Sequence, residues 1–132
     1  MNPTKQHEIP KVSEYCKLRE VCGLSVISEE AAEKGLPQSV FSVTLRQNNE
    51  LVGMGRIVGD GACHLQIVDI AIRPDFQKRG LSTIILSDIK EFIDKKVPPS
   101  AIVSLFADVD YLYQKFGFDY PIRSKGMFYK RS

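Results

Sequence analysis

The chain of 132 residues has few cysteines, no long apolar run and almost no excess of charge of either sign. Its three cysteines are odd in number and lack Cys-x-x-Cys spacing, which argues against a disulfide framework and against a zinc site. No apolar stretch approaches the length of a membrane span, and residues 1–10 are polar, unlike a signal peptide. A formal net charge of +2 gives no basic surface of the kind that binds nucleic acid. We therefore expect a cytoplasmic protein with no metal, no membrane association and no nucleic-acid partner.

Two common nucleotide-binding loops are also missing from the sequence. It contains neither G-x-x-x-x-G-K-[ST] nor G-x-G-x-x-G, so it predicts neither a P-loop NTPase nor a dinucleotide-binding fingerprint. With 43% apolar residues, the chain can supply one hydrophobic core, and we expect a single domain over residues 1–132.

Hydrophobic periodicity and turn residues predict alternating strands and helices along the chain. The predicted order is a strand at 3–9, a helix from Pro10 to Cys22, a short helix capped by Ser28, strands at 39–47, 51–58 and 63–72, a helix at 80–94, a buried strand at 101–106, a short helix capped by Asp108, and closing strands at 118–120 and 126–130. The three middle strands must be antiparallel, whereas the unit from 63 to 106 requires a right-handed parallel crossover. An α/β fold with a mixed, mostly antiparallel sheet flanked by helices satisfies both demands.

Residues 68–82 are the most informative segment for function. They predict a buried strand, a short turn and a loop that opens an amphipathic helix. The amides at a helix start have no intrahelical partner and carry partial positive charge, so they attract phosphate. Lys78 and Arg79 add charge there, and Gly80 lets the backbone approach a bulky anion. The segment therefore predicts a ligand that ends in a pyrophosphate.

Residues 77–82, Gln-Lys-Arg-Gly-Leu-Ser, resemble the acetyl-CoA loop [QR]-x-x-G-x-[GA] of the GNAT N-acetyltransferase superfamily, with Ser82 in place of Gly or Ala. The predicted element order is also that of the GNAT fold. The resemblance implies acetyl-CoA bound in a V-shaped opening where the sheet is splayed between its fourth and fifth strands. The cofactor-binding residues that it implies are Ile70, Ala71, Ile72, Gln77, Lys78, Arg79, Gly80, Leu81, Ser82, Thr83, Tyr113 and Phe116.

Tyr113 is the candidate general acid. It lies in Leu-Tyr-Gln-Lys-Phe-Gly-Phe at 112–118, which resembles the family signature LYxKxGF, whose tyrosine protonates the CoA thiolate in many relatives. A phenol suits this transfer because the pKa values of phenol and thiol are comparable. From periodicity alone, Tyr113 is simply one aromatic on the buried stripe of a helix. One departure concerns Phe106, which stands where many relatives have an asparagine.

Asp69 is the candidate general base. Alternation along the strand places it on one face with Leu65, Ile67 and Ala71, where burial would raise its pKa. The alternative is a structural ion pair with Arg56 of the neighbouring strand, which could instead pair with Asp60 or hold an anionic acceptor. The base is left open between Asp69, a chain of waters and no dedicated group.

Together these patterns predict an enzyme, an acetyl-CoA-dependent N-acetyltransferase that moves an acetyl group to a primary amine by direct attack in a ternary complex. Its near-neutral charge favours a small-molecule acceptor. The alternatives are a non-catalytic CoA- or acyl-CoA-binding regulatory or interaction domain, and a module that binds some other phosphate-bearing ligand. A homodimer formed through the edge of a closing strand at 126–130 is also left open.

Overall fold

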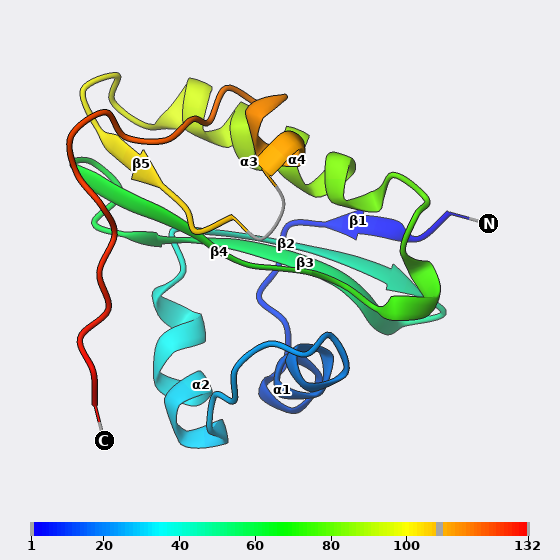
Figure 1. Ribbon diagram of the computed structural model, residues 1–132. Coiled ribbons are helices and arrows are strands. Elements are labelled where there is room, and N and C mark those ends of the chain that lie inside the picture. The colour runs from blue at the N-terminus through cyan, green and yellow to red at the C-terminus, as the bar shows by residue number, and fades with distance from the viewer. Residues whose placement is uncertain (1, 108–109, 132) are drawn as a thin grey trace.

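The computed structural model describes residues 2–107 and 110–131. Its centre is a five-stranded sheet with the strands in sequential order (Figure 1). The first three pairings are antiparallel and the last is parallel, as predicted. The strands are β1 (Thr4–Gln6), β2 (Phe41–Gln47), β3 (Glu50–Gly59), β4 (His64–Ile72) and β5 (Ile102–Ser104).

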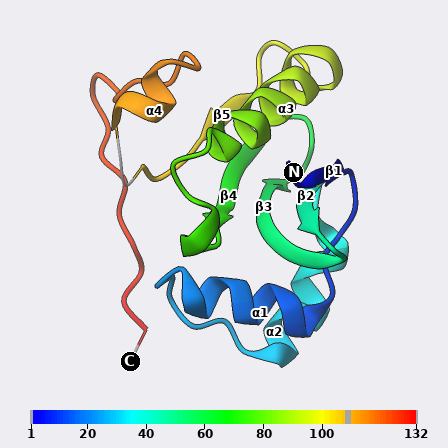
Figure 2. The ribbon, with the colours of Figure 1, turned by 90° about the vertical axis from the view of Figure 1, so that its right-hand side faces the viewer.

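Helices cover both faces of the sheet, which confirms the predicted α/β architecture. The helices near the N-terminus lie on one face, and those that follow β4 lie on the other side of the sheet plane, with the last of them beside the β5 end of the sheet (Figure 2). In chain order these are α1 (Val12–Val21) and α2 (Glu29–Gly35), then α3 (Leu81–Lys96) and α4 (Asp110–Gln114), with short 3-10 turns η1 (Leu36–Gln38) and η2 (Pro74–Phe76). No helix in the described part of the chain is long and apolar enough to cross a membrane.

Each face of the sheet has its own hydrophobic core. Under α3, buried residues of β2, β3, β4 and α3 pack together, including Val43, Ile57, Leu65, Ile67, Ile85 and Ile89. Under α1 and α2, a smaller core contains Tyr15, Leu18, Ala32, Leu36, Met54 and Ala71. Both cores follow from apolar stripes on the helices that meet apolar faces of the strands.

Local sequence signals set most element boundaries. The Ser28 hydroxyl accepts a hydrogen bond from the Ala31 amide and caps α2, as predicted. The α1 helix begins at Val12 rather than at Pro10, because Lys11 is its N-cap and donates its backbone amide to the Glu14 carboxylate. At the β3–β4 turn, the Asp60 carboxylate accepts three backbone amides, which lower its pKa to about 2.

A β-bulge interrupts β4 next to the centre of the sheet. Met54 of β3 pairs with Ala71 while Arg56 pairs with Val68, so Gly55 faces two residues of β4 instead of one. One of these two, Asp69, has a left-handed backbone with φ of 60°. An extra residue shifts the alternation of side chains, so the two halves of β4 do not share one face pattern.

Because of the bulge, Asp69 does not share a face with Leu65 and Ile67, contrary to the sequence prediction. Leu65 and Ile67 do belong to the core under α3. Asp69 instead points to the opposite face, where its carboxylate contacts the side chain of Tyr15 on α1. Ala71 lies on this second face as well, so the prediction that it shares a face with Asp69 is confirmed.

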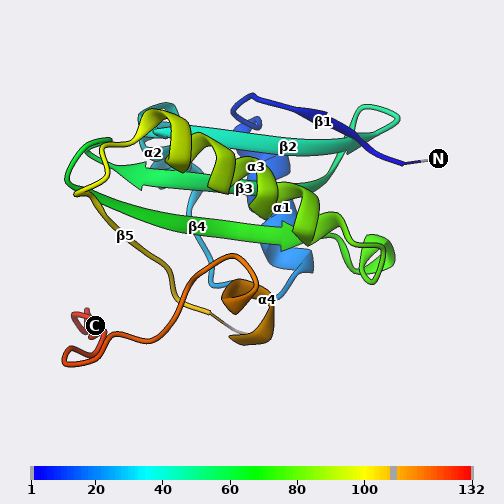
Figure 3. The same cartoon turned by 90° about the horizontal axis from the view of Figure 1, so that it is seen from above.

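The C-terminal part differs most from the sequence prediction. β5 spans three residues rather than 101–106, and it is not buried, since Ile102 is 60% exposed. Over 118–120 and 126–130 the chain is irregular, so the predicted closing strands are wrong (Figure 3). Their aromatic residues favour strands, but a strand forms only where a partner strand offers hydrogen bonds. The predicted cap Asp108 lies outside the described residues.

Replacing Gly55 by alanine should destabilise the fold. A Cβ there would lie 2.6 Å from Cγ2 of Ile85 and 2.8 Å from Cδ1 of Ile70, so the packing of α3 on β3 must shift. We expect the free energy of unfolding to fall by about 1–3 kcal/mol, measured by urea denaturation. Gly35→Ala is the matched control, because apart from its chain neighbours and the backbone of its own helix, no described atom lies within 4 Å of the added Cβ. Equal effects of the two substitutions would contradict this packing.

Candidate functional site

The site begins where β4 and β5 separate. The two strands pair only through His64–Ile102, Leu65–Val103 and Gln66–Ser104, and β4 then continues to Ile72. Beyond the last pair, a cavity of about 200 Å³ opens between residues 67–70 and the chain that follows β5. This is the predicted splay of the sheet. The cavity is lined by Arg19, Leu24, Ile67, Val68, Asp69, Ile70, Leu105, Phe106 and Tyr113.

A cluster of charges forms the polar wall of this cavity. The Asp69 carboxylate accepts hydrogen bonds from the Tyr15 hydroxyl at 2.8 Å, from Nε of Arg56 at 2.9 Å and from the Arg19 guanidinium. The side chains of Asp69, Arg19 and Arg56 are only 5%, 11% and 10% exposed. Burial, and then the hydrogen bond to Asp69, raises the pKa of Tyr15, which therefore stays protonated as a donor.

Further hydrogen bonds tie this cluster to neighbouring loops. Arg19 donates to both the carbonyl and the hydroxyl of Ser25, which follows α1. Arg56 donates to the Ser39 hydroxyl just before β2. The cluster contains two guanidinium groups and one carboxylate, so its net charge is positive, and Arg19 and Asp69 are the members that line the cavity.

The structure decides between the partners proposed for Arg56. It pairs with Asp69, as the structural alternative predicted, whereas the Asp60 carboxylate accepts amides of its own turn. Sequence reasoning missed Arg19 altogether. Its spacing from Tyr15, one helical turn along α1, is the signal that would have placed both side chains on one face.

The predicted phosphate loop forms the start of α3. Gly80, with φ of 76°, precedes the helix, and Lys78 also has a left-handed backbone with φ of 64°. Among the described residues, no side chain caps this helix start, and the first turn contains no acid. The amides of Leu81, Ser82 and Thr83 therefore have no intrahelical acceptors, which makes this terminus suited to an anion.

The side chains of the loop are held against the end of β4. Gln77 donates its side-chain amide to the Ile72 carbonyl at 3.0 Å. Arg79 lies over the ring of Phe76 at 4.8 Å and donates to the Asp75 carbonyl. The Cys22 thiol also donates to the Ile72 carbonyl, and burial raises the pKa of this thiol. The loop is thus anchored to the strand that leads into the cavity.

The remaining residues predicted for the site lie on β4 and in or just after α4. Ile70 lines the cavity, whereas Ala71 and Ile72 pair with β3 and are buried in opposite cores. Tyr113 of α4 reaches the cavity and is half-buried. Phe116, in the turn after α4, is half-buried but does not line it. The structure therefore brings Tyr113, Ile70 and Asp69 together, and it places the loop at the far end of β4.

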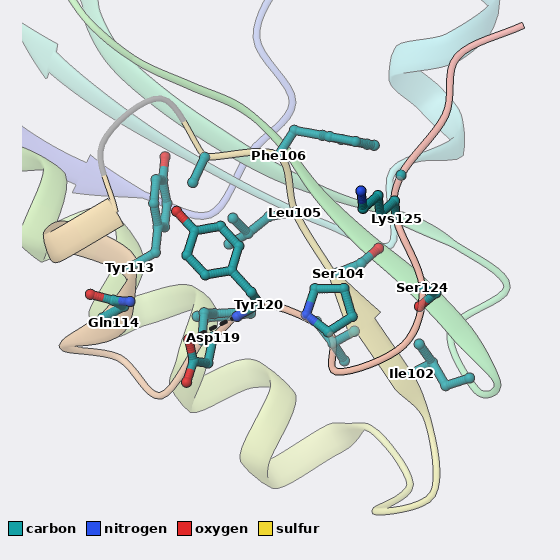
Figure 4. Close-up of a pocket in the computed structure, with 15 residues that line it drawn as sticks. Ile102, Ser104, Leu105, Phe106, Tyr113, Gln114, Asp119, Tyr120, Ser124 and Lys125 are labelled. Carbon is teal, nitrogen blue, oxygen red and sulfur yellow. Dashed lines mark hydrogen bonds between the residues drawn. The ribbon is translucent and has the colours of Figure 1, made fainter.

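A second, larger cavity of about 660 Å³ lies on the other side of Tyr113. It is bounded by β5, by α4 and by residues 118–126, and Figure 4 shows Tyr113 and Tyr120 on its wall. Phe106, where the resemblance noted in the sequence led us to expect an asparagine, is 54% exposed here. The centroid of its ring lies 4.9 Å from that of Phe128, so an aromatic pair lies here beside polar lining residues such as Ser104 and Lys125.

Comparison with known proteins identifies the family of this chain. Residues 5–124 match the model of the acetyltransferase (GNAT) domain. The crystal structure of a probable acetyltransferase from Staphylococcus aureus is 42% identical, with a TM-score of 0.89 over 97% of this chain and 98% of that one. A GNAT-family acetyltransferase from Streptococcus pneumoniae has a TM-score of 0.78 at 19% identity and covers 97% of each chain, a likeness of fold alone.

A curated relative gives the same family. The uncharacterized N-acetyltransferase ycf52 of Porphyra purpurea is 33% identical over 102 residues, which are 71% of this chain and 57% of that protein. The chain thus spans little more than half the length of this relative. The family model nevertheless covers most of the chain, including the phosphate loop, β4 and α4. The chain therefore belongs to the GNAT acetyltransferase family.

Proposed function

We propose that this protein transfers an acetyl group from acetyl-CoA to the primary amine of a small molecule, by direct attack of the amine in a ternary complex. One observation carries the proposal. The strand that opens a cavity beside Tyr113 leads, past its C-terminal end, to a helix start with free amides and two adjacent cations. A long ligand with an anionic end and a reactive end fits such an arrangement.

The phosphate loop is the part that would hold the pyrophosphate of the cofactor. Amides of residues 78–82 would donate to phosphate oxygens, and Lys78 and Arg79 would supply charge. Apart from its chain neighbours, no described residue lies within 4 Å of a Cβ built on Gly80, so space is present at the loop. Ile70 and Ile72 would contact the pantetheine arm along β4. When bound, acetyl-CoA supplies the activated thioester carbonyl.

Tyr113 would donate a proton to the departing thiolate. Its position on the wall of the cavity, next to Ile70, supports this role. The proposed acceptor enters from the side of Arg19 and Leu24, where Asp69 is the nearest carboxylate of the cavity wall. Asp69 remains the proposed base, and the two arginines bound to it give it a second, structural role. Their excess positive charge favours an acceptor that also carries an anionic group.

Acetyl-CoA and CoA should both raise the melting temperature, whereas ATP and NAD should not. A ligand at a hundredfold excess over its Kd adds about 2.7 kcal/mol, a shift of several degrees in thermal unfolding. In Ser82→Asp, the new charge meets the helix dipole favourably but repels phosphate, so the apo protein should stay stable while CoA binds at least about tenfold more weakly. Ser87→Asp, an exposed site farther along α3, is the control. Equal shifts with ATP would refute the loop assignment.

Tyr113→Phe should leave CoA binding intact and lower kcat by about 10²–10⁴-fold, because the thiolate loses its proton donor. Thiol release with a panel of small amines, including amino acids and amino sugars, measures turnover. Tyr111→Phe, an exposed tyrosine on the same helix, is the matched control and should retain full activity. Turnover that is unchanged in Tyr113→Phe would remove this residue from the mechanism. An absence of turnover with every amine would favour the non-catalytic CoA-binding domain, for which the aromatic Phe106 is the supporting observation.

Asp69→Asn should destabilise the protein by about 3–5 kcal/mol, because Arg19 and Arg56 lose their buried counter-charge. Urea denaturation measures this, with Asp75→Asn as a control in which an exposed ion pair is lost with little effect on the free energy of unfolding. The base assignment is tested separately, by the pH dependence of kcat/KM at a temperature where the variant is folded. Loss of the acidic limb supports Asp69 as the base. If that limb persists, Asp69 acts only through its ion pairs.

A further inference from the structure

Two side chains of opposite charge meet in the wall of the smaller cavity. Asp69 of β4 and Arg19 of α1 both line this cavity of about 200 Å³, and the Arg19 guanidinium donates to the Asp69 carboxylate. The two side chains are only 5% and 11% exposed, so little of either group is in contact with water. Such a pair can bind a ligand only if its groups keep hydrogen-bonding positions that the protein does not use.

Arg19 keeps one such position. A guanidinium group has five N–H donors. Nε and Nη2 of Arg19 bind the carbonyl and the hydroxyl of Ser25, and Nη1 donates to Oδ1 of Asp69. These four hydrogen bonds leave the second N–H of Nη1 without an acceptor among the described residues.

Asp69 keeps an acceptor position on the neighbouring atom. An ionised carboxylate offers about four lone-pair sites. Oδ2 accepts from Tyr15 and from Arg56, whereas Oδ1 accepts only from Arg19 within the described part of the chain. The unused donor and the unused acceptor therefore belong to two atoms that are hydrogen-bonded to each other. A ligand that fills both positions must carry an acceptor and a donor only a few bonds apart.

The charge of the cluster indicates what the acceptor group of such a ligand is. Arg19, Arg56 and Asp69 together leave one positive charge in excess. An α-amino acid whose amine has lost its proton, as it must before it attacks a carbonyl, carries one negative charge and balances that excess. A phosphate monoester carries nearly two negative charges at neutral pH and would lie against the Asp69 carboxylate. The cluster thus favours a carboxylate over a phosphate.

The rest of the cavity suits a small, uncharged side chain. Leu24, Ile67, Ile70 and Leu105 supply apolar lining beside the charged pair. A volume of about 200 Å³ corresponds to about six or seven molecules of liquid water, each of which takes about 30 Å³. This space accommodates one small molecule, and its apolar wall disfavours a charged side chain.

We propose that the acceptor is an α-amino acid with an uncharged side chain, whose carboxylate binds Arg19 and whose amine donates to Oδ1 of Asp69. The proposal rests on the acetyl transfer proposed above, since it names the acceptor of that reaction. The acceptor nitrogen forms a bond to the acetyl carbon, and the C–S bond of the thioester breaks. The ammonium gives up two protons in all. One equivalent reaches the thiolate through Tyr113, and the other passes by way of Asp69 to water.

Three amines with one carbon skeleton test the need for a carboxylate. Leucine carries the group, leucinamide has a neutral amide in its place, and 3-methylbutylamine lacks it. Measured by thiol release from acetyl-CoA, kcat/KM for leucine should exceed that for the other two at least about 100-fold, because a site built to bind a polar group rejects the analogue without it. 6-Aminohexanoate carries both groups too far apart and should be equally poor.

Binding without turnover tests the same site independently. Leucine should raise the melting temperature of the protein, alone or with CoA, which has no acetyl group to transfer, and leucinamide should not. If no amine is acetylated but leucine still binds, the proposed catalysis fails and the acceptor site stands. The absence of leucine binding both with and without CoA overturns the acceptor site.

Two lysine substitutions separate ligand binding from structural support. Arg19→Lys keeps a counter-charge for Asp69 but loses the second arm of the guanidinium, so it should raise KM for leucine at least about tenfold and change kcat less. Arg56→Lys is the matched comparison, because Arg56 also binds Asp69 but does not line the cavity. It should lower the melting temperature to a similar extent and raise KM much less.

Three further results would overturn the proposal while leaving the acetyl transfer itself in place. These are turnover of leucinamide or 3-methylbutylamine as fast as that of leucine, a preference for an amino sugar phosphate, and an equal rise of KM in Arg19→Lys and Arg56→Lys. The first two are measured on the unmodified protein, so they decide the question even if the lysine variants do not fold.

Discussion

The buried carboxylate of Asp69 holds together the elements that form the site. It lies on β4 and binds Arg56 of β3 and both Tyr15 and Arg19 of α1. Taking three charged groups out of water is costly, and the cost is met only while each keeps its partners. The position of α1 against the sheet, and with it one wall of the cavity, therefore depends on this cluster.

The β-bulge is what makes the cluster possible. In a regular strand, Asp69 would point into the core under α3 with Leu65 and Ile67, where no cation is available among the packed residues of that core. The extra residue opposite Gly55 turns the carboxylate to the α1 face. It also interrupts β4 just past the point at which β5 stops pairing, so the bulge, the charges and the cavity coincide.

Three parts of the site follow one another along β4. The charged cluster and Tyr113 occupy its middle, the buried pair Ala71 and Ile72 continue the strand, and the loop before α3 lies at its end. On one side of the site, Phe106 and Phe128 form an aromatic pair that connects it to the exposed C-terminal segment.

Sequence alone determined the features that depend on neighbours in the chain. The cap at Ser28 and the start of α3 depend on residues within about four positions, and the central strands show alternating or apolar runs bounded by short turns, all of which local patterns can reveal. Only the tertiary structure decided the face on which Asp69 lies, its choice of Arg19 and Arg56, and the point at which β5 stops pairing with β4. A bulge, a buried ion pair and strand pairing each join residues far apart in sequence, and no local pattern specifies which distant group will be there.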